Sequence, residues 1–144
     1  MNFSLQRPKL AIFDSTLLVL LLIFIITLIR IIVLFFSPLE LSVDEAQYWD
    51  WSRSLEFGYY SKPPLIAWLI SGSTKLLGNY EWSIRFFSPI IHFFISLILW
   101  LTTAKIFGNF SGRISAVIWI TLPSTSLGCF IISTDTPLLF FWSL

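Results

Sequence analysis

The sequence is poor in charged side chains and in residues that bind transition metals. Only 12% of its 144 residues are Asp, Glu, Lys or Arg, about half the share found in an average soluble domain. A formal net charge of +1 gives no reason to expect nucleic acid as a partner. One cysteine excludes an internal disulfide, and one cysteine with one histidine is too few for a site of soft metal ligands. We expect neither a metal nor a cofactor, and any metal would have to bind carboxylates.

Apolar and aromatic residues are abundant instead. Hydrophobic residues make up 56% of the chain, which includes 15 Phe and 7 Trp, and the mean hydropathy is +0.84. We predict an all-α integral membrane protein with a single membrane domain over residues 1–144. A crossing helix needs about 20 residues, and apolar runs of that kind occur at residues 15–36, 84–107 and 114–132, with a fourth run, 137–144, that stops before it could cross. Arg30 interrupts the first run and must either reach the interface or face a polar interior.

The segment of residues 37–83 has a different character. It holds six of the eight acidic residues and all four tyrosines. Ser42 and Glu45 stand three residues apart in the pattern of a capping box, which predicts an amphipathic helix that lies in the membrane interface and ends at Gly58. Pro64 then predicts the start of a second short helix through Leu65–Leu77. We therefore expect two juxtamembrane helices in this first outer loop.

Basic residues near the spans predict the orientation. Arg7 and Lys9 precede the first span, and Lys105 and Arg113 flank a predicted tight turn at residues 108–112. Alternating spans place all four on one side, which the positive-inside rule makes cytoplasmic. The amino terminus is then cytoplasmic, the loop 37–83 and Asp135 lie outside, and the protein is expected in the inner or plasma membrane.

Three carboxylates are candidates for chemistry. Asp44 and Glu45 open the predicted outer helix, and Asp135 follows the third span at the same membrane face. Carboxylates at a wet membrane rim can serve as the general base and the orienting group in a transfer to a hydroxyl. The structural alternative is that Asp44 and Glu45 interact with a helix dipole and that Asp135 is an N-cap.

Two cations in the same region have two interpretations each. Lys62 stands between Ser61 and Pro63, and Arg85 begins the second span. Either side chain can bind a phosphate or act as an interfacial anchor for lipid headgroups. His92 is interpreted as a packed helix residue. Pro123 is interpreted as a kink whose freed carbonyls bind neighbouring hydroxyls.

Four segments in this order carry a family resemblance: Asp44–Trp49, Gly58–Trp68, Arg85 and Thr134–Leu138. Together they resemble the amino-terminal part of membrane glycosyltransferases that use a polyprenyl-phosphate sugar, the GT-C type. This superfamily includes the dolichyl-phosphate-mannose protein mannosyltransferases and the undecaprenyl-phosphate aminoarabinose transferases. The resemblance implies that Asp44 is the main catalytic carboxylate, that Asp135 and the neighbouring Glu45 are further acidic site residues, and that Lys62 contacts the lipid phosphate.

The resemblance also implies the reaction. A glycosyltransferase of this kind moves a sugar from polyprenyl phosphate to a hydroxyl of a lipid, glycan or protein, with Lys62 and Arg85 stabilising the phosphate. Members of the superfamily are much longer, so the 144-residue chain is expected to be inactive or incomplete alone, and a partner polypeptide could complete the fold. The alternative is a non-catalytic, small multi-pass membrane protein that binds lipid headgroups or a partner subunit.

Overall fold

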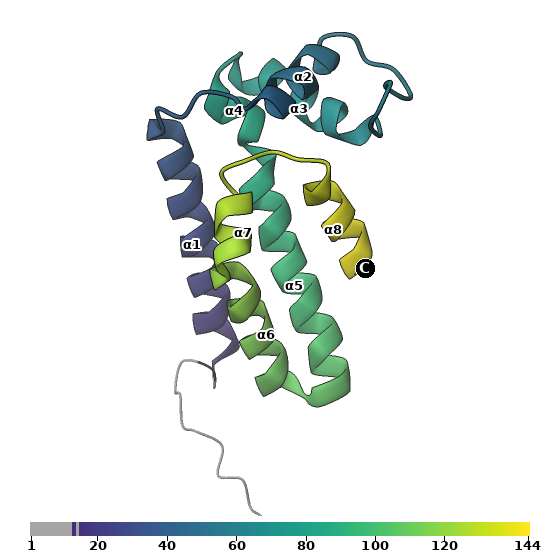
Figure 1. Ribbon diagram of the computed structural model, residues 1–144. Helices are drawn as coiled ribbons and strands as arrows, with labels where there is room; N and C mark the ends of the chain where they lie inside the picture. Colours follow the sequence, from purple (N-terminus) through teal and green to yellow (C-terminus); the bar gives the residue numbers. More distant parts are fainter. Residues whose placement is uncertain (1–12, 14) are drawn as a thin grey trace, which may run out of the picture.

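The computed structural model describes residue 13 and residues 15–144, and this part of the chain contains helices and no strand, as the sequence predicts. The helices are α1 (Thr16–Phe36), α2 (Val43–Ser52), α3 (Leu65–Leu77), α4 (Glu81–Arg85), α5 (Phe87–Phe107), α6 (Asn109–Thr121), α7 (Pro123–Gly128) and α8 (Asp135–Ser143). Helices α1, α5, α6 and α8 run roughly parallel or antiparallel to one another (Figure 1). Helices α2, α3 and α4, which we call the cap layer, lie across one end of this bundle.

Two helical segments are long and apolar enough to cross a membrane. These are α1 and the combined α4–α5 segment, Glu81–Phe107. Along α1 the buried residues recur every three or four positions and so form one stripe that faces the bundle: Val19, Ile23, Thr27, Arg30 and Leu34. Most of the remaining α1 side chains are exposed leucine, isoleucine and phenylalanine, as expected for a surface in contact with lipid tails.

The third apolar run differs from the prediction of one span at residues 114–132. The helix begins earlier, at Asn109, and breaks after Thr121, so that α6 has 13 residues and α7 has six. Pro123 explains the break, because it has no N–H to donate and restricts the residue before it. Leu122 is accordingly extended, with ψ of 135°. Neither helix alone has the length of a crossing. A third span would therefore need both α6 and α7.

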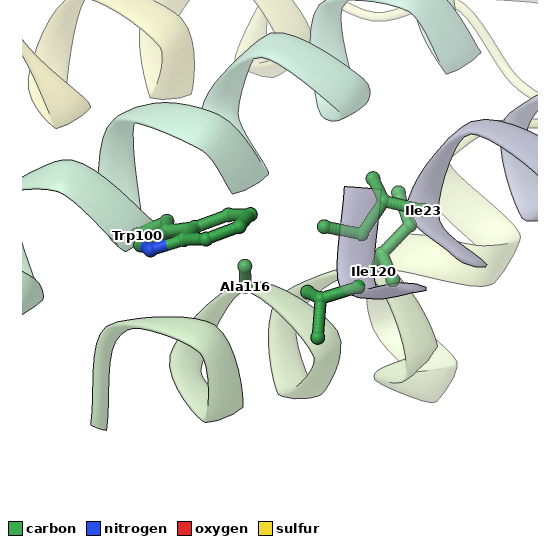
Figure 2. Packing of buried hydrophobic residues seen from close by; sticks show 5 residues of the cluster. Ile23, Trp100, Ala116 and Ile120 are labelled. Atoms are coloured by element: carbon green, nitrogen blue, oxygen red, sulfur yellow. The ribbon is translucent and has the colours of Figure 1, made fainter. Parts of the chain in front are cut away.

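Close packing joins α5 to α6. The predicted turn of five residues is shorter in the structure, since Gly108 alone, with φ of +88°, separates the two helices. A Cβ on Gly112 would lie 2.6 Å from the carbonyl oxygen of Trp100, so only glycine allows this approach. Trp100 packs with Ile23 of α1 and with Ala116 and Ile120 of α6 (Figure 2). This cluster is the core of the bundle.

The cap layer follows the sequence patterns closely. Ser42 caps α2 through the predicted capping box with Glu45, and α3 spans Leu65–Leu77 as predicted. Helix α2 ends at Ser52, however, well before Gly58. A second apolar cluster joins the cap layer to the loop between α7 and α8: Tyr48, Ile66, Ile70, Ile84 and Ile132.

Candidate functional site

Glu45 connects three parts of the chain at the base of the cap layer. Its side chain is 1% exposed. Its Oε2 accepts a hydrogen bond of 3.0 Å from the amide of Ser42 at the start of α2. Its Oε1 accepts one of 3.0 Å from the amide of Ile132, in the loop before α8. The carboxylate therefore fixes the first turn of α2 against the segment that leads to Asp135.

Arg85 is the third connection. Its Nε and Nη2 donate to the two carboxylate oxygens of Glu45 at 2.8 and 2.7 Å, which is the bidentate geometry that makes such pairs strong. Its Nη1 and Nη2 also donate to the carbonyl oxygens of Leu39 and Glu40 at 2.9 and 2.8 Å. The Arg85 side chain is 4% exposed, so the structure places it inside the protein, where it faces other protein groups.

The surroundings of Glu45 keep it ionised. Burial alone would raise the pKa of this carboxyl. The hydrogen bonds from Arg85, Ser42 and Ile132, together with the charge of Arg85, outweigh burial and lower the pKa below its ordinary value of 4.5. Glu45 is thus a fixed anion at neutral pH and is poorly suited to exchange a proton with a substrate.

The loop between α7 and α8 is held from two further directions. Ser88 of α5 is fully buried and donates to the carbonyl oxygens of Gly128 and Ile131, with a bond of 2.7 Å to Gly128. Arg30 of α1 donates to Ser126 Oγ at 2.7 Å and to Cys129 Sγ at 3.3 Å. Together with Glu45 of α2, these contacts fix the loop from three helices. They also fix the position of Asp135, which follows the loop.

The two candidate aspartates are exposed at the end of the molecule where the cap layer lies. Asp44 is in the first turn of α2, directly before Glu45. Asp135 is the first residue of α8, three residues after Ile132. The N-cap position of α8 belongs to Thr134, so the alternative of Asp135 as N-cap is wrong. The Glu45–Ile132 hydrogen bond brings the segments that carry both aspartates together, as the sequence predicts.

Lys62 lies in the exposed turn between α2 and α3. Aromatic contacts support this turn: Tyr59 stacks on Trp51 with ring centroids 4.9 Å apart, and its hydroxyl donates to the carbonyl oxygen of Trp51 at 2.9 Å. Among the residues that the structure describes, no carboxylate forms an ion pair with Lys62. Its ammonium is therefore available to an external anion.

An apolar groove begins beside Lys62. One cavity of about 200 Å³ lies between the start of α3 and α8, lined in part by Pro63, Leu65, Pro137 and Phe141. A second cavity of about 270 Å³ shares Leu65, Pro137 and Phe141 and continues along α5. We call the two together the apolar groove. It runs from the start of α3 along α5 and α8, and no charged side chain lines it.

Reasoning from sequence missed the partner of Arg30. The break between α6 and α7 leaves the carbonyl of Ile120 without a helical partner, and Arg30 Nη2 donates to this oxygen at 2.5 Å. Sequence reasoning assigned such carbonyls to neighbouring hydroxyls. The signal was present, since an arginine inside an apolar run needs an acceptor and a proline in another run frees one.

Within the described residues, no three His, Cys, Asp or Glu side chains gather as metal ligands.

Comparison with known proteins gives two matches. The sequence model of the dolichyl-phosphate-mannose-protein mannosyltransferase family matches residues 61–144, which include Lys62, Arg85 and Asp135. The lipid A galacturonosyltransferase RgtD of Rhizobium johnstonii (strain DSM 114642 / LMG 32736 / 3841) is 44% identical over 116 residues, or 80% of this chain and 24% of that protein. The chain thus spans about a quarter of the length of this relative. No solved structure matches the present chain.

Proposed function

Since the chain belongs to the dolichyl-phosphate-mannose-protein mannosyltransferase family, a family of membrane glycosyltransferases, we propose that it forms the active-site portion of an enzyme that transfers a sugar from polyprenyl phosphate to a hydroxyl. The observation that carries the proposal is the junction at Glu45. This residue fixes the segment of Asp44 against the loop that leads to Asp135, with the Lys62 turn beside α8. The proposed site then contains two exposed carboxylates, Asp44 and Asp135, and the exposed ammonium of Lys62.

Asp44 is the proposed general base. Its carboxylate takes the proton of the acceptor hydroxyl while the hydroxyl oxygen attacks the anomeric carbon of the sugar. The bond between that carbon and the phosphate oxygen breaks, and the phosphate leaves with the electron pair as polyprenyl phosphate. Attack opposite the leaving group inverts the anomeric centre. Asp135 orients the acceptor or the sugar through hydrogen bonds to hydroxyls.

Lys62 and the apolar groove are proposed to bind the lipid donor. The leaving phosphate gains negative charge in the transition state, and an ammonium without a protein partner can stabilise that charge. The groove begins at Pro63, next to Lys62, and its apolar walls suit an isoprenoid chain. A donor with its phosphate at Lys62 would have its tail in the groove.

Glu45 and Arg85 are proposed as positioning residues. The sequence predicts Glu45 as a catalytic residue and Arg85 as a phosphate ligand, but each is the other's buried partner and neither side chain reaches solvent. Their contribution is to keep Asp44 and Asp135 at a fixed separation. The donor and acceptor groups then meet a preformed arrangement, which lowers the cost of alignment.

The proposed acceptor follows from the activity of the relative. RgtD is a lipid A galacturonosyltransferase, so a lipid with sugar hydroxyls is the acceptor class we propose. The site is proposed to lie on the outer face of the inner membrane. Lys105 is in the last turn of α5 and Arg113 is near the start of α6, and the junction of these two helices lies at the opposite end of the bundle from the cap layer (Figure 1). Arg7 and Lys9 lie outside the described residues.

A chimera tests the proposal. In it, this chain replaces the matching quarter of RgtD, and sugar transfer to lipid A is measured in isolated membranes. We expect transfer by the chimera. We also expect Lys62→Ala to raise the KM for the donor lipid at least tenfold, because a charge-assisted phosphate contact is lost. Lys75→Ala, which removes an exposed lysine of α3, is the matched control and should leave KM unchanged.

The same experiment addresses the non-catalytic alternative. A chimera that inserts and has native helicity but transfers no sugar would show that this chain does not form the site. It would favour a protein that only binds headgroups or a partner. Equal KM values for the Lys62 and Lys75 variants would contradict the assignment of the phosphate to Lys62.

A further inference from the structure

A polar cavity of about 220 Å³ lies among α5, α6, α7 and the first turn of α8. Its walls carry an imidazole, an indole, hydroxyls and a carboxylate: His92, Trp119, Ser124, Thr125, Ser133 and Asp135. It adjoins the break in the third apolar run. Non-helical backbone at membrane depth is tolerated where it is buried in protein or lines a cavity with polar contents. We call this cavity the polar pocket.

Two nitrogen atoms at the polar pocket have no partner. His92 is 3% exposed. Its Nδ1, like Nε1 of Trp119, is buried and has no hydrogen bond from or to any residue that the structure describes. Leaving such a group unpaired inside a protein is unfavourable, so a polar ligand that pairs with both is favoured.

The residues that line the polar pocket indicate which class of polar ligand it would bind. The pocket offers hydrogen-bond donors and acceptors together, and its two rings lie with centroids 5.9 Å apart and planes 36° apart. Its one formal charge is the carboxylate of Asp135, and neither Lys nor Arg lines it. A phosphate would be repelled there. A ring that carries several hydroxyls would find acceptors in Asp135 and His92, a donor in Trp119 and aromatic surface for its C–H faces.

The first turn of α8 lies between the polar pocket and the apolar groove. Thr134 and Pro137 line the groove, whereas Asp135 and Thr136, between them, line the polar pocket. The two cavities therefore lie on different faces of the helix turn that carries Asp135, the carboxylate proposed to orient the acceptor or the sugar.

We propose that the polar pocket is the sugar subsite of the lipid donor, in which His92 and Trp119 bind hydroxyls of the pyranose ring. This inference rests on the proposed function. His92 is then a specificity residue of α5 and not only a packed one. The pocket distinguishes a lipid phosphate that carries a sugar from one that does not, and Lys62 binds both.

Binding to the 144-residue protein in lipid nanodiscs tests this proposal. The probes are short-chain polyprenyl phosphates that carry galactose, mannose or no sugar, and the readout is Kd by titration calorimetry. We expect a sugar-bearing lipid to bind at least tenfold more tightly than the bare one. His92→Phe and Trp119→Phe retain rings and lose the two nitrogens, and each should abolish that preference. Trp142→Phe, at an exposed tryptophan of α8, is the control and should retain it.

Each result separates the two proposals. Equal affinity of the native protein for all three lipids, or an unchanged preference in both variants, overturns the sugar subsite and leaves the proposed function standing. Binding of no lipid overturns both. Helicity measured by circular dichroism identifies a variant that has failed to fold, and in that case Trp119→Tyr, which also removes the indole nitrogen, replaces it.

Discussion

Glu45 and Arg85 form the pair on which the site's geometry depends. Breaking a buried ion pair by removing one partner costs about 3–5 kcal/mol, because the other charge remains buried without compensation. We predict that Glu45→Gln lowers the free energy of unfolding in detergent by about 3 kcal/mol. Glu40→Gln, at an exposed neighbour, should change it by less than about 0.5 kcal/mol. Denaturant titration followed by circular dichroism measures both, and equal values would mean that the pair is unimportant.

The pKa of Glu45 predicts a dependence of stability on pH. A carboxyl whose pKa is lower in the folded state than in the unfolded state stabilises the fold fully above its unfolded pKa, here near 4.5. That contribution is lost as the pH falls below 4.5 and through the lowered value. We therefore expect Glu45 to change the melting temperature little from pH 7 to pH 5. Below pH 4.5 the melting temperature should fall as Glu45 becomes protonated. The fall should be smaller in Glu45→Gln, and an identical fall in both proteins would contradict the assignment.

At the scale of the helices, the contact of α5 with α6 depends on one glycine. A Cβ at Gly112 would lie 2.6 Å from a backbone oxygen and 2.8 Å from Ala104 Cβ, so Gly112→Ala must push the helices apart. Overpacking of this kind costs about 1–3 kcal/mol. Gly58→Ala is the matched control, because nothing lies within 4 Å of a Cβ there. We expect Gly112→Ala to lower the melting temperature and Gly58→Ala to leave it unchanged; the reverse order would refute this packing.

Arg30 stabilises the break that Pro123 causes between α6 and α7. Its guanidinium binds the freed carbonyl of Ile120 and the side chains of Ser126 and Cys129. Arg30→Met keeps much of the length and removes the donors, so α7 should loosen and expose the buried thiol of Cys129. We predict at least tenfold faster maleimide labelling of Cys129 in this variant. Arg113→Met, at the other end of α6, is the control, and equal labelling rates would show that Arg30 does not hold the break.

The sequence predicts those elements whose signals are local. The capping box of Ser42 with Glu45 and the proline before Leu65 lie within a few residues of the helices they start, so the start of each helix is predicted correctly, whereas the predicted end of α2 at Gly58 is wrong. The pairing of Glu45 with Arg85 joins residues 40 positions apart, and no local pattern encodes such a contact. Arg30 with Ile120 is separated by 90 positions. Candidate residues could therefore be found from sequence, whereas their division into exposed and buried groups required the structure.

For the whole molecule, the proposed orientation places the cap layer outside the cell membrane. Cysteines introduced at opposite ends in a Cys129→Ser background test this. Tyr60, a fully exposed residue of the Lys62 turn, should react as Tyr60→Cys with a membrane-impermeant maleimide in intact spheroplasts. Lys105→Cys, at the far end of α5, should react only after permeabilisation. The opposite pattern would invert the topology and place the site in the cytoplasm.

The central claim is that Asp44 is the base of a sugar transfer performed at the junction of the cap layer and the α7–α8 loop. The most direct test is the rate of transfer by the RgtD chimera with Asp44→Asn, compared with Asp50→Asn, an exposed aspartate farther along the same helix. Loss of a general base lowers kcat by about 10²–10⁴-fold. We predict a loss of that size for Asp44→Asn, native rates for Asp50→Asn, and normal membrane insertion of both. An Asp44→Asn chimera that transfers sugar at the native rate would contradict the account.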